Sequence, residues 1–173
     1  YLAKKDRPII LSTGLSEMYE IDKAIRTIEN AGNNKIVILH CVSIYPPKDE
    51  QVNLRNILTL QKIYPNYPIG FSDHTLGTSI PIASVALGVC VIEKHFTLDR
   101  SIIGMDNQMA VESGEFESII LSCKEANAAL GGEDRILSND EFAQRKLMRR
   151  SAVAGRKLES GHVLDLLDIN FMH

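Results

Sequence analysis

The sequence lacks the features that mark membrane, secreted or nucleic-acid-binding chains. Its 173 residues contain no apolar run near the roughly 20 residues that cross a bilayer, and no signal-peptide pattern opens it. The formal net charge of −3 offers no basic surface for nucleic acid or an anionic membrane. Hydrophobic residues make up 45% of the chain, as in an ordinary globular domain. We therefore expect a cytoplasmic enzyme or binding domain with no nucleic-acid or membrane partner.

Cysteine is scarce, and its spacing is not that of a disulfide framework or a zinc site. The three cysteines, Cys41, Cys90 and Cys123, are far apart and each lies in an apolar segment. An odd, unpaired set of this kind favours reduced thiols in the core, in keeping with a cytoplasmic protein.

Four short apolar runs alternate with helical patterns along the first 130 residues. We predict strands at 8–14, 35–41, 68–74 and 89–95, and helices at 16–31, 52–64, 79–87 and 115–130. The connections are too long for hairpins, so the strands are expected to be parallel. A glycine-rich phosphate loop, usual in a doubly wound sheet, does not follow the first strand, which ends in Ser12-Thr13-Gly14. We predict an α/β fold of four consecutive βα units, half of a (β/α)₈ TIM-type barrel.

The last 36 residues show a different sequence pattern. Ser138 begins a capping box with Glu141, which predicts a helix that ends near Arg150. Beyond Ser151 the pattern changes to short strand-like pieces around a turn at 160–161, the expected start of a second small domain. Because the chain begins at Tyr1 rather than at methionine, we expect it to be part of a longer protein.

Two histidines end neighbouring predicted strands and are the first candidates for chemistry. Side chains alternate along a strand, so His74 shares a face with Ser72, and His95 shares a face with Glu93. Parallel strands lie about 4.8 Å apart, so both imidazoles could reach one divalent cation. Glu93 could then accept the other ring N–H of a ligating histidine. The alternative is that each histidine is satisfied locally.

Hydroxyl groups also follow the predicted strands. Ser12 ends the first strand, while Ser43 and Tyr45 come just after the second. The carboxyl ends of barrel strands are where substrates bind, although each hydroxyl could instead cap a turn.

The remaining polar residues near the strand ends are weaker candidates. Asp99 and Asp106 lie in the loop after the fourth strand, where a carboxylate could orient a hydroxyl or simply be solvated. The alternation predicts that His40 is a packing residue and that Lys94 points away from the site, which argues against a Schiff-base enzyme.

Four motifs occur in the order found in one enzyme family. They are Ile10–Gly14, His40–Pro46, Gly70–Thr75 and Glu93–Asp99. Together they resemble the sialic acid (N-acetylneuraminate) synthase family, which includes the pseudaminic and legionaminic acid synthases. The resemblance implies a transferase of carbohydrate biosynthesis that condenses phosphoenolpyruvate with an N-acetylated amino sugar and releases phosphate.

The resemblance also implies roles for particular residues. His74 and His95 would hold Mn²⁺ or Mg²⁺, with Glu93 supporting them. Tyr45 and Asp106 would be catalytic, and Asp106 would also contact the acceptor sugar. The remaining substrate-binding residues implied are Ser12, Ser43 and Ser72. The loop that reads Gly104-Met105-Asp106-Asn107 departs from the family pattern, so the identity of the amino sugar stays open.

The resemblance divides the chain into three parts. Residues 1–137 would hold barrel strands five to eight, residues 138–150 a linker helix, and residues 151–173 the truncated start of an antifreeze-like domain. The family's phosphoenolpyruvate-binding lysines and glutamates belong to the earlier strands, so the fragment alone is expected to be inactive. Half a barrel exposes strand edges, so we expect a homodimer or pairing with the missing half.

Two other functions remain possible from the residues. A metal-dependent hydrolase barrel also places histidines at strand ends, but usually carries a His-x-His pair that this chain lacks. A non-catalytic half-barrel subunit that binds a sugar or a partner protein would need no metal, so replacing both histidines would leave its binding intact.

Overall fold

The structure, a computed structural model, describes residues 1–172 and contains two compact units. The first is Tyr1–Gly131 and the second begins at Gly132. Within the described residues, no helix is both long enough and apolar enough to cross a membrane. Each unit is described separately below.

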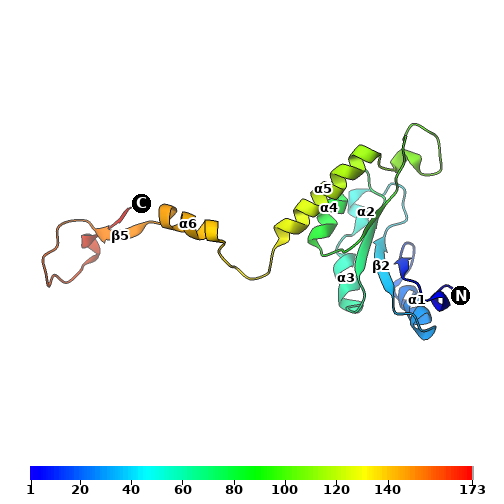
Figure 1. Cartoon of the computed structure of the whole chain (residues 1–173), viewed down its shortest axis with the longest axis horizontal. Helices are drawn as coiled ribbons and strands as arrows, with labels where there is room; N and C mark the ends of the chain where they lie inside the picture. Colours follow the sequence, from blue (N-terminus) through cyan, green and yellow to red (C-terminus); the bar gives the residue numbers. More distant parts are fainter. Residues whose placement is uncertain (173) are drawn as a thin grey trace. The chain divides into compact units, whose positions relative to one another are not determined.

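The first unit is built on a four-stranded parallel sheet (Figure 1). Its strands follow the order of the sequence: β1 Ile9–Ser12, β2 Ile36–Cys41, β3 Ile69–Asp73 and β4 Ile92–Lys94. All five residues of β3 are buried, and its last two, Ser72 and Asp73, are polar. The parallel arrangement confirms the predicted α/β class, while β4 is shorter than the predicted strand at 89–95.

Helices join successive strands, as parallel pairing requires. They are α1 Met18–Asn30, α2 Asp49–Val52, α3 Asn56–Ile63 and α4 Ser79–Ala86. A further helix, α5 Ser113–Leu130, follows β4, and short 3₁₀ turns lie at η1 Ala3–Lys5 and η2 Asn107–Met109. α4 and α5 pack side by side (Figure 1). The predicted helix at 52–64 is confirmed over α3, but it begins at Asn56, because Asn53 adopts a left-handed conformation with φ 50° and separates α2 from α3. Asparagine tolerates this conformation better than most residues.

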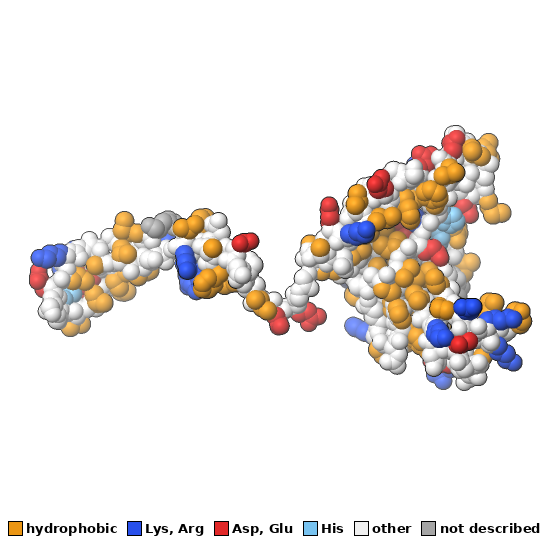
Figure 2. Space-filling model, viewed as in Figure 1, with side chains coloured by type: hydrophobic (Ala, Val, Ile, Leu, Met, Phe, Trp, Pro, Cys, Tyr) orange, Lys and Arg blue, Asp and Glu red, His pale blue; other side chains and the backbone are white. Residues whose placement is uncertain are grey.

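Much apolar surface of the first unit is uncovered. Figure 2 shows hydrophobic side chains gathered on the visible face of this unit, with charged side chains toward its margins. Large apolar side chains that are exposed include Ile10, Leu98, Ile103, Met105 and Leu121. The predicted core position of all three cysteines is wrong for Cys90, which is exposed. All three cysteines are free thiols.

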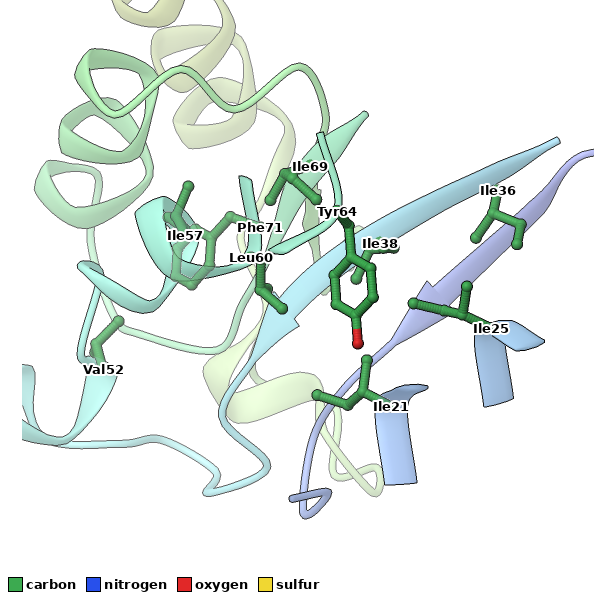
Figure 3. Packing of buried hydrophobic residues seen from close by; sticks show 10 residues of the cluster. All are labelled: Ile21, Ile25, Ile36, Ile38, Val52, Ile57, Leu60, Tyr64, Ile69 and Phe71. Atoms are coloured by element: carbon green, nitrogen blue, oxygen red, sulfur yellow. The ribbon is translucent and has the colours of Figure 1, made fainter. Parts of the chain in front are cut away.

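The core lies between the sheet and the helices α1 and α3 (Figure 3). It consists of ten buried side chains: Ile21, Ile25, Ile36, Ile38, Val52, Ile57, Leu60, Tyr64, Ile69 and Phe71. The helical members recur at a spacing of three or four residues, which places them on one face. This layer fixes the sheet from one side and leaves the carboxyl ends of the strands free to carry polar groups.

The second unit contains α6 Asn139–Met148 and an antiparallel pair, β5 Ser151–Ala154 with β6 Ile169–Met172, preceded by the 3₁₀ turn η3 Leu166–Asp168. The predicted cap is confirmed, because the Ser138 hydroxyl accepts the Glu141 N–H at 3.1 Å. Asp168 is 1% exposed and bonds Arg156 and His162. These contacts connect the two ends and the middle of the loop at 155–168 that joins β5 to β6.

Candidate metal and substrate site

His74 follows the last residue of β3 and is held by the backbone of a neighbouring segment. Its Nδ1 lies 3.1 Å from the carbonyl oxygen of Val42, which comes just after β2. A carbonyl can only accept, so Nδ1 carries the proton and Nε2 keeps its lone pair. The residue is 7% exposed. His74 therefore presents a fixed, unprotonated ring nitrogen at the carboxyl end of the sheet.

His95 follows β4 and lies beside His74. The centroids of the two imidazole rings are 5.2 Å apart, and the planes are tilted by 56°. The side chain of His95 is 32% exposed, and its Nδ1 is 3.8 Å from Oδ2 of Asp106, longer than a hydrogen bond. The structure thus brings together the two histidines that the strand alternation predicted at one end of the sheet.

Tyr45 covers both histidine rings. Its ring centroid lies 4.4 Å from that of His74 and 5.9 Å from that of His95. Because the tyrosine ring packs against both imidazoles, it shields them from water on one side. Tyr45 comes from the segment after β2, as predicted, so three successive strand ends contribute to this cluster of rings.

The loop after β4 returns to the sheet and carries Asp106 to the cluster. The Val111 N–H donates to the His95 carbonyl at 2.9 Å, and the Thr97 N–H donates to the Val111 carbonyl at 2.9 Å. Arg100 Nε donates to the Ala110 carbonyl at 3.0 Å. These contacts fix both ends of the loop, so Asp106 is held close to His95.

A pocket of about 280 Å³ opens next to the two histidines. It is lined by Tyr45, Pro46, Leu76, Met105, Asp106, Gln108 and Met109. The mixture of apolar side chains with one carboxylate and one amide suits an amphipathic small molecule. Sequence patterns missed Leu76, Gln108 and Met109, because only the return of the loop brings them to this place.

Glu93 does not contact His74 as expected. Its Oε1 accepts the Ser72 hydroxyl at 2.7 Å, while the His74 ring N–H is taken by the Val42 carbonyl. The prediction that Glu93 supports a ligating histidine is therefore wrong for His74, because a backbone carbonyl occupies that position. Ser72 has one donor, and Glu93 uses it, so the serine presents only lone pairs in this arrangement.

Ser12 and Ser43 lie farther along the same end of the sheet. Ser12 ends β1, separated from β3 by β2, and is exposed. Ser43 Oγ is 3.8 Å from Cys41 Sγ and lies over Gly14, where a Cβ would approach the hydroxyl to 2.1 Å. The small residue at Gly14 thus leaves the space that the Ser43 hydroxyl occupies. Their roles in substrate binding stay predictions.

The other face of the same strands is packed and paired, as the alternation predicted. His40 is 4% exposed, stacks on Phe71 and places Nε2 2.7 Å from the Val52 carbonyl, which confirms it as a packing residue. Lys94 forms a buried ion pair with Asp73 at 2.6 Å. Neither residue reaches the histidine cluster.

The electrostatics of the cluster favour a neutral His74 imidazole. Burial lowers the pKa of His74; the hydrogen bond to Val42 opposes this shift, and the nearby His95 adds to it. A neutral ring with a free Nε2 is the form that binds a metal. The described residues contain no group of three or more His, Cys, Asp or Glu side chains arranged for a metal. The two histidines fit a divalent cation whose other positions are open to water or substrate.

Fold and site together define a parallel α/β protein with a two-histidine site at the carboxyl end of its sheet. The profile of the NeuB family matches residues 1–135, and the chain belongs to this family. It is 42% identical over 170 residues to an uncharacterised protein of Methanocaldococcus jannaschii, covering 98% of this chain and 50% of that protein.

Named relatives and solved structures agree with this membership. An N,N'-diacetyllegionaminic acid synthase of Legionella pneumophila is 36% identical over 173 residues, with 98% of this chain and 48% of the relative covered. The crystal structure of the sialic acid synthetase of Leptospira borgpetersenii, in complex with citrate, superposes with a TM-score of 0.77 at 32% identity. That match covers 84% of this chain and 50% of the other. The chain spans about half the length of these relatives.

Proposed function

We propose that the chain is the part of a nonulosonic (sialic-type) acid synthase that carries its divalent-metal site and its acceptor-sugar pocket. The parent enzyme would condense phosphoenolpyruvate with an N-acetylated amino sugar and release phosphate. The observation that carries this proposal is the approach of the His74 and His95 rings to 5.2 Å beside the pocket of Tyr45 and Asp106. Membership of the NeuB family supplies the class of reaction.

In this proposal the four parallel strands are strands five to eight of a (β/α)₈ barrel. The free edges of β1 and β4 and the exposed apolar side chains of the first unit support pairing with further strands or a second copy. Because the chain spans about half of its relatives, the condensation belongs to the whole synthase. The 173 residues alone are expected to bind metal without turnover.

His74 and His95 would hold Mn²⁺ or Mg²⁺ through their unprotonated nitrogens. When bound there, the cation would supply Lewis acidity to the aldehyde of the amino sugar. Tyr45 shields the imidazoles from water, and Asp106 accepts a hydrogen bond from a sugar hydroxyl within the pocket. Ser12 and Ser43 donate to phosphoenolpyruvate. Ser72 would donate only after its hydroxyl leaves Glu93.

Manganese titration of the 173-residue chain tests the metal site. Free Mn²⁺ is measured by electron paramagnetic resonance for the natural chain and for the variant with His74→Ala and His95→Ala. We expect binding by the natural chain and at least a tenfold weaker affinity in the variant, since a cation loses both imidazole ligands. His162→Ala, which removes a histidine of the second unit, is the matched control and should bind normally.

Two results would overturn the proposal. One is the absence of Mn²⁺ binding by the natural chain, and the other is unchanged affinity in the double variant. For the intact synthase, phosphate release from phosphoenolpyruvate that depends on an N-acetylated amino sugar tests the reaction itself.

A further inference from the structure

A buried ammonium group holds the residues on both sides of His74. Lys94 Nζ donates to Oδ2 of Asp73 at 2.6 Å and to the carbonyl oxygen of Thr75 at 2.6 Å. The other carboxylate oxygen, Oδ1, accepts the Thr75 backbone N–H at 2.9 Å and the Thr75 hydroxyl at 2.8 Å. The side chains of Asp73 and Lys94 are 0% and 2% exposed. We call these contacts the Asp73–Lys94 clamp.

The clamp touches the backbone next to both candidate ligands. His74 lies between Asp73 and Thr75, and His95 directly follows Lys94. Asp73 and Lys94 are also register partners where β3 pairs with β4. The same ammonium group therefore ties the turn that carries one histidine to the strand that carries the other. Because side chains alternate, the clamp acts from the opposite face and leaves the ligand side open.

We propose that Asp73 and Lys94 are positioning residues that fix the separation and orientation of the His74 and His95 rings, and so set the affinity of the site for a divalent cation. The inference rests on the proposed metal site and adds two residues to it. The Lys94 ammonium donates short, charge-assisted hydrogen bonds to two partners, the Asp73 carboxylate and the Thr75 carbonyl. These bonds fix the backbone next to the histidines, and the backbone in turn aligns the rings.

Packing alone does not account for this choice of residues. A buried ion pair is often no more stabilising than apolar residues of the same volume, because both charges must leave water. Apolar side chains at these positions would fill the core equally well. They would not bond the Thr75 carbonyl or orient the carboxylate that caps the Thr75 N–H. The feature specific to the ion pair is the fixed geometry of the turn at residues 73–75.

The test uses a neutral pair in the 173-residue chain, Asp73→Asn with Lys94→Met. This variant leaves no uncompensated buried charge, so it separates positioning from simple destabilisation. We expect its dissociation constant for Mn²⁺ to rise about 10–100-fold, as when supporting contacts of metal ligands are removed. Urea unfolding confirms that it is folded under the conditions of the titration.

A core change in the same sheet provides the matched control. Ile38 is fully buried in β2, and its apolar side chain forms no hydrogen bond with either histidine. Ile38→Val should leave the Mn²⁺ affinity within about twofold of the natural chain, as expected for an independent site. A tenfold loss in this control would show that general loosening of the sheet explains the effect, and it would overturn the positioning role.

A second readout needs no metal. In the natural chain, long-range ¹H–¹⁵N spectra should show His74 with its proton on Nδ1, held by the Val42 carbonyl. In the neutral pair we expect a mixture of the two tautomers, because the ring is no longer aligned. If the natural chain takes up no Mn²⁺, the proposed metal site fails, and this spectrum alone decides whether the clamp positions the ring.

Unchanged Mn²⁺ affinity together with an unchanged His74 tautomer in a folded neutral pair would overturn the inference. If the neutral pair does not fold, Thr75→Val replaces it. This variant keeps the charges and removes only the hydroxyl bond to Asp73. It should show a smaller change in the same direction, and natural values for both measurements would again contradict the clamp.

Discussion

The two faces of the β3–β4 pair use similar polar groups in opposite ways. On one face, the Asp73 carboxylate and the Lys94 ammonium lie 2.6 Å apart with 0% and 2% of their side chains exposed. On the other, the His95 ring and the Asp106 carboxylate are 3.8 Å apart and 32% and 38% exposed. A buried charge must be paired within the protein, whereas an exposed polar group remains available to form hydrogen bonds with a ligand. The closed face therefore holds the backbone, and the open face is free for chemistry.

The largest expected effect comes from breaking the closed face. Lys94→Met leaves the Asp73 carboxylate buried without its cation, which should lower the free energy of unfolding by about 3–5 kcal/mol. Urea unfolding followed by circular dichroism measures this loss. The control is Lys35→Met, because Lys35 pairs with Asp6 at 2.9 Å on the surface with 54% and 76% exposure. It should cost no more than about 1 kcal/mol. Equal losses would contradict the contrast between buried and exposed pairs.

Acidification tests the rings on both faces. Burial lowers the pKa of His40 and of His74 below the ordinary histidine value. The unfolded chain then binds more protons than the folded chain below about pH 6.5, so the free energy of unfolding is greatest above that pH and falls on acidification. Each histidine that is protonated in the unfolded chain and neutral in the folded chain lowers the free energy of unfolding by about 1.4 kcal/mol per pH unit of acidification.

The measurement is urea unfolding at several pH values between 5.5 and 7.5. His40→Gln should show a shallower fall than the natural chain, because one of the two rings with lowered pKa is gone. A natural chain that gains stability on acidification over this range would be inconsistent with neutral, buried imidazoles.

A smaller effect is expected from the hydrogen bond on the open face. Ser72→Ala removes the donor to Glu93, which should lower the free energy of unfolding by about 0.5–1.5 kcal/mol. The exposed carboxylate turns to water, so the loss stays well below that of Lys94→Met. Thermal unfolding measures it, and a loss above about 3 kcal/mol would place this contact among the buried, structural ones.

The smallest effect is expected at Gly14. A Cβ there would meet the Ser43 hydroxyl at 2.1 Å, but that hydroxyl can rotate away. The strain is opposed by about 0.4–1 kcal/mol from the reduced freedom of the unfolded chain, so the midpoint of thermal unfolding should barely move. Adding Ser43→Ala to Gly14→Ala should remove the hydroxyl contact and leave only the milder approach to Cys41 Sγ at 3.0 Å. A midpoint that falls sharply and is not restored in the double variant would indicate a backbone shift.

Strand positions and side-chain parity followed from the sequence because they depend on local rules. Apolar runs gave the four parallel strands, and alternation placed His74 opposite Asp73 and His95 opposite Lys94. The start of the helix predicted at 52–64 was misplaced, because the left-handed Asn53 breaks the chain there without any change in the hydrophobic pattern. The pattern of apolar residues indicates which face of a helix is buried, but it does not indicate where a single left-handed residue ends the helix.

The sequence by itself determined the fold class, the family and the pair of histidines, because periodicity and motif residues carry that information along the chain. Only the tertiary structure decided which group holds the His74 ring. The Val42 carbonyl replaced Glu93 at His74, and the pocket gained Leu76 and Gln108 from separate loops. Backbone carbonyls are the same at every residue, and contacts between distant loops depend on how the strands close together. The physical reason is that such contacts arise from packing in space, which no local pattern records.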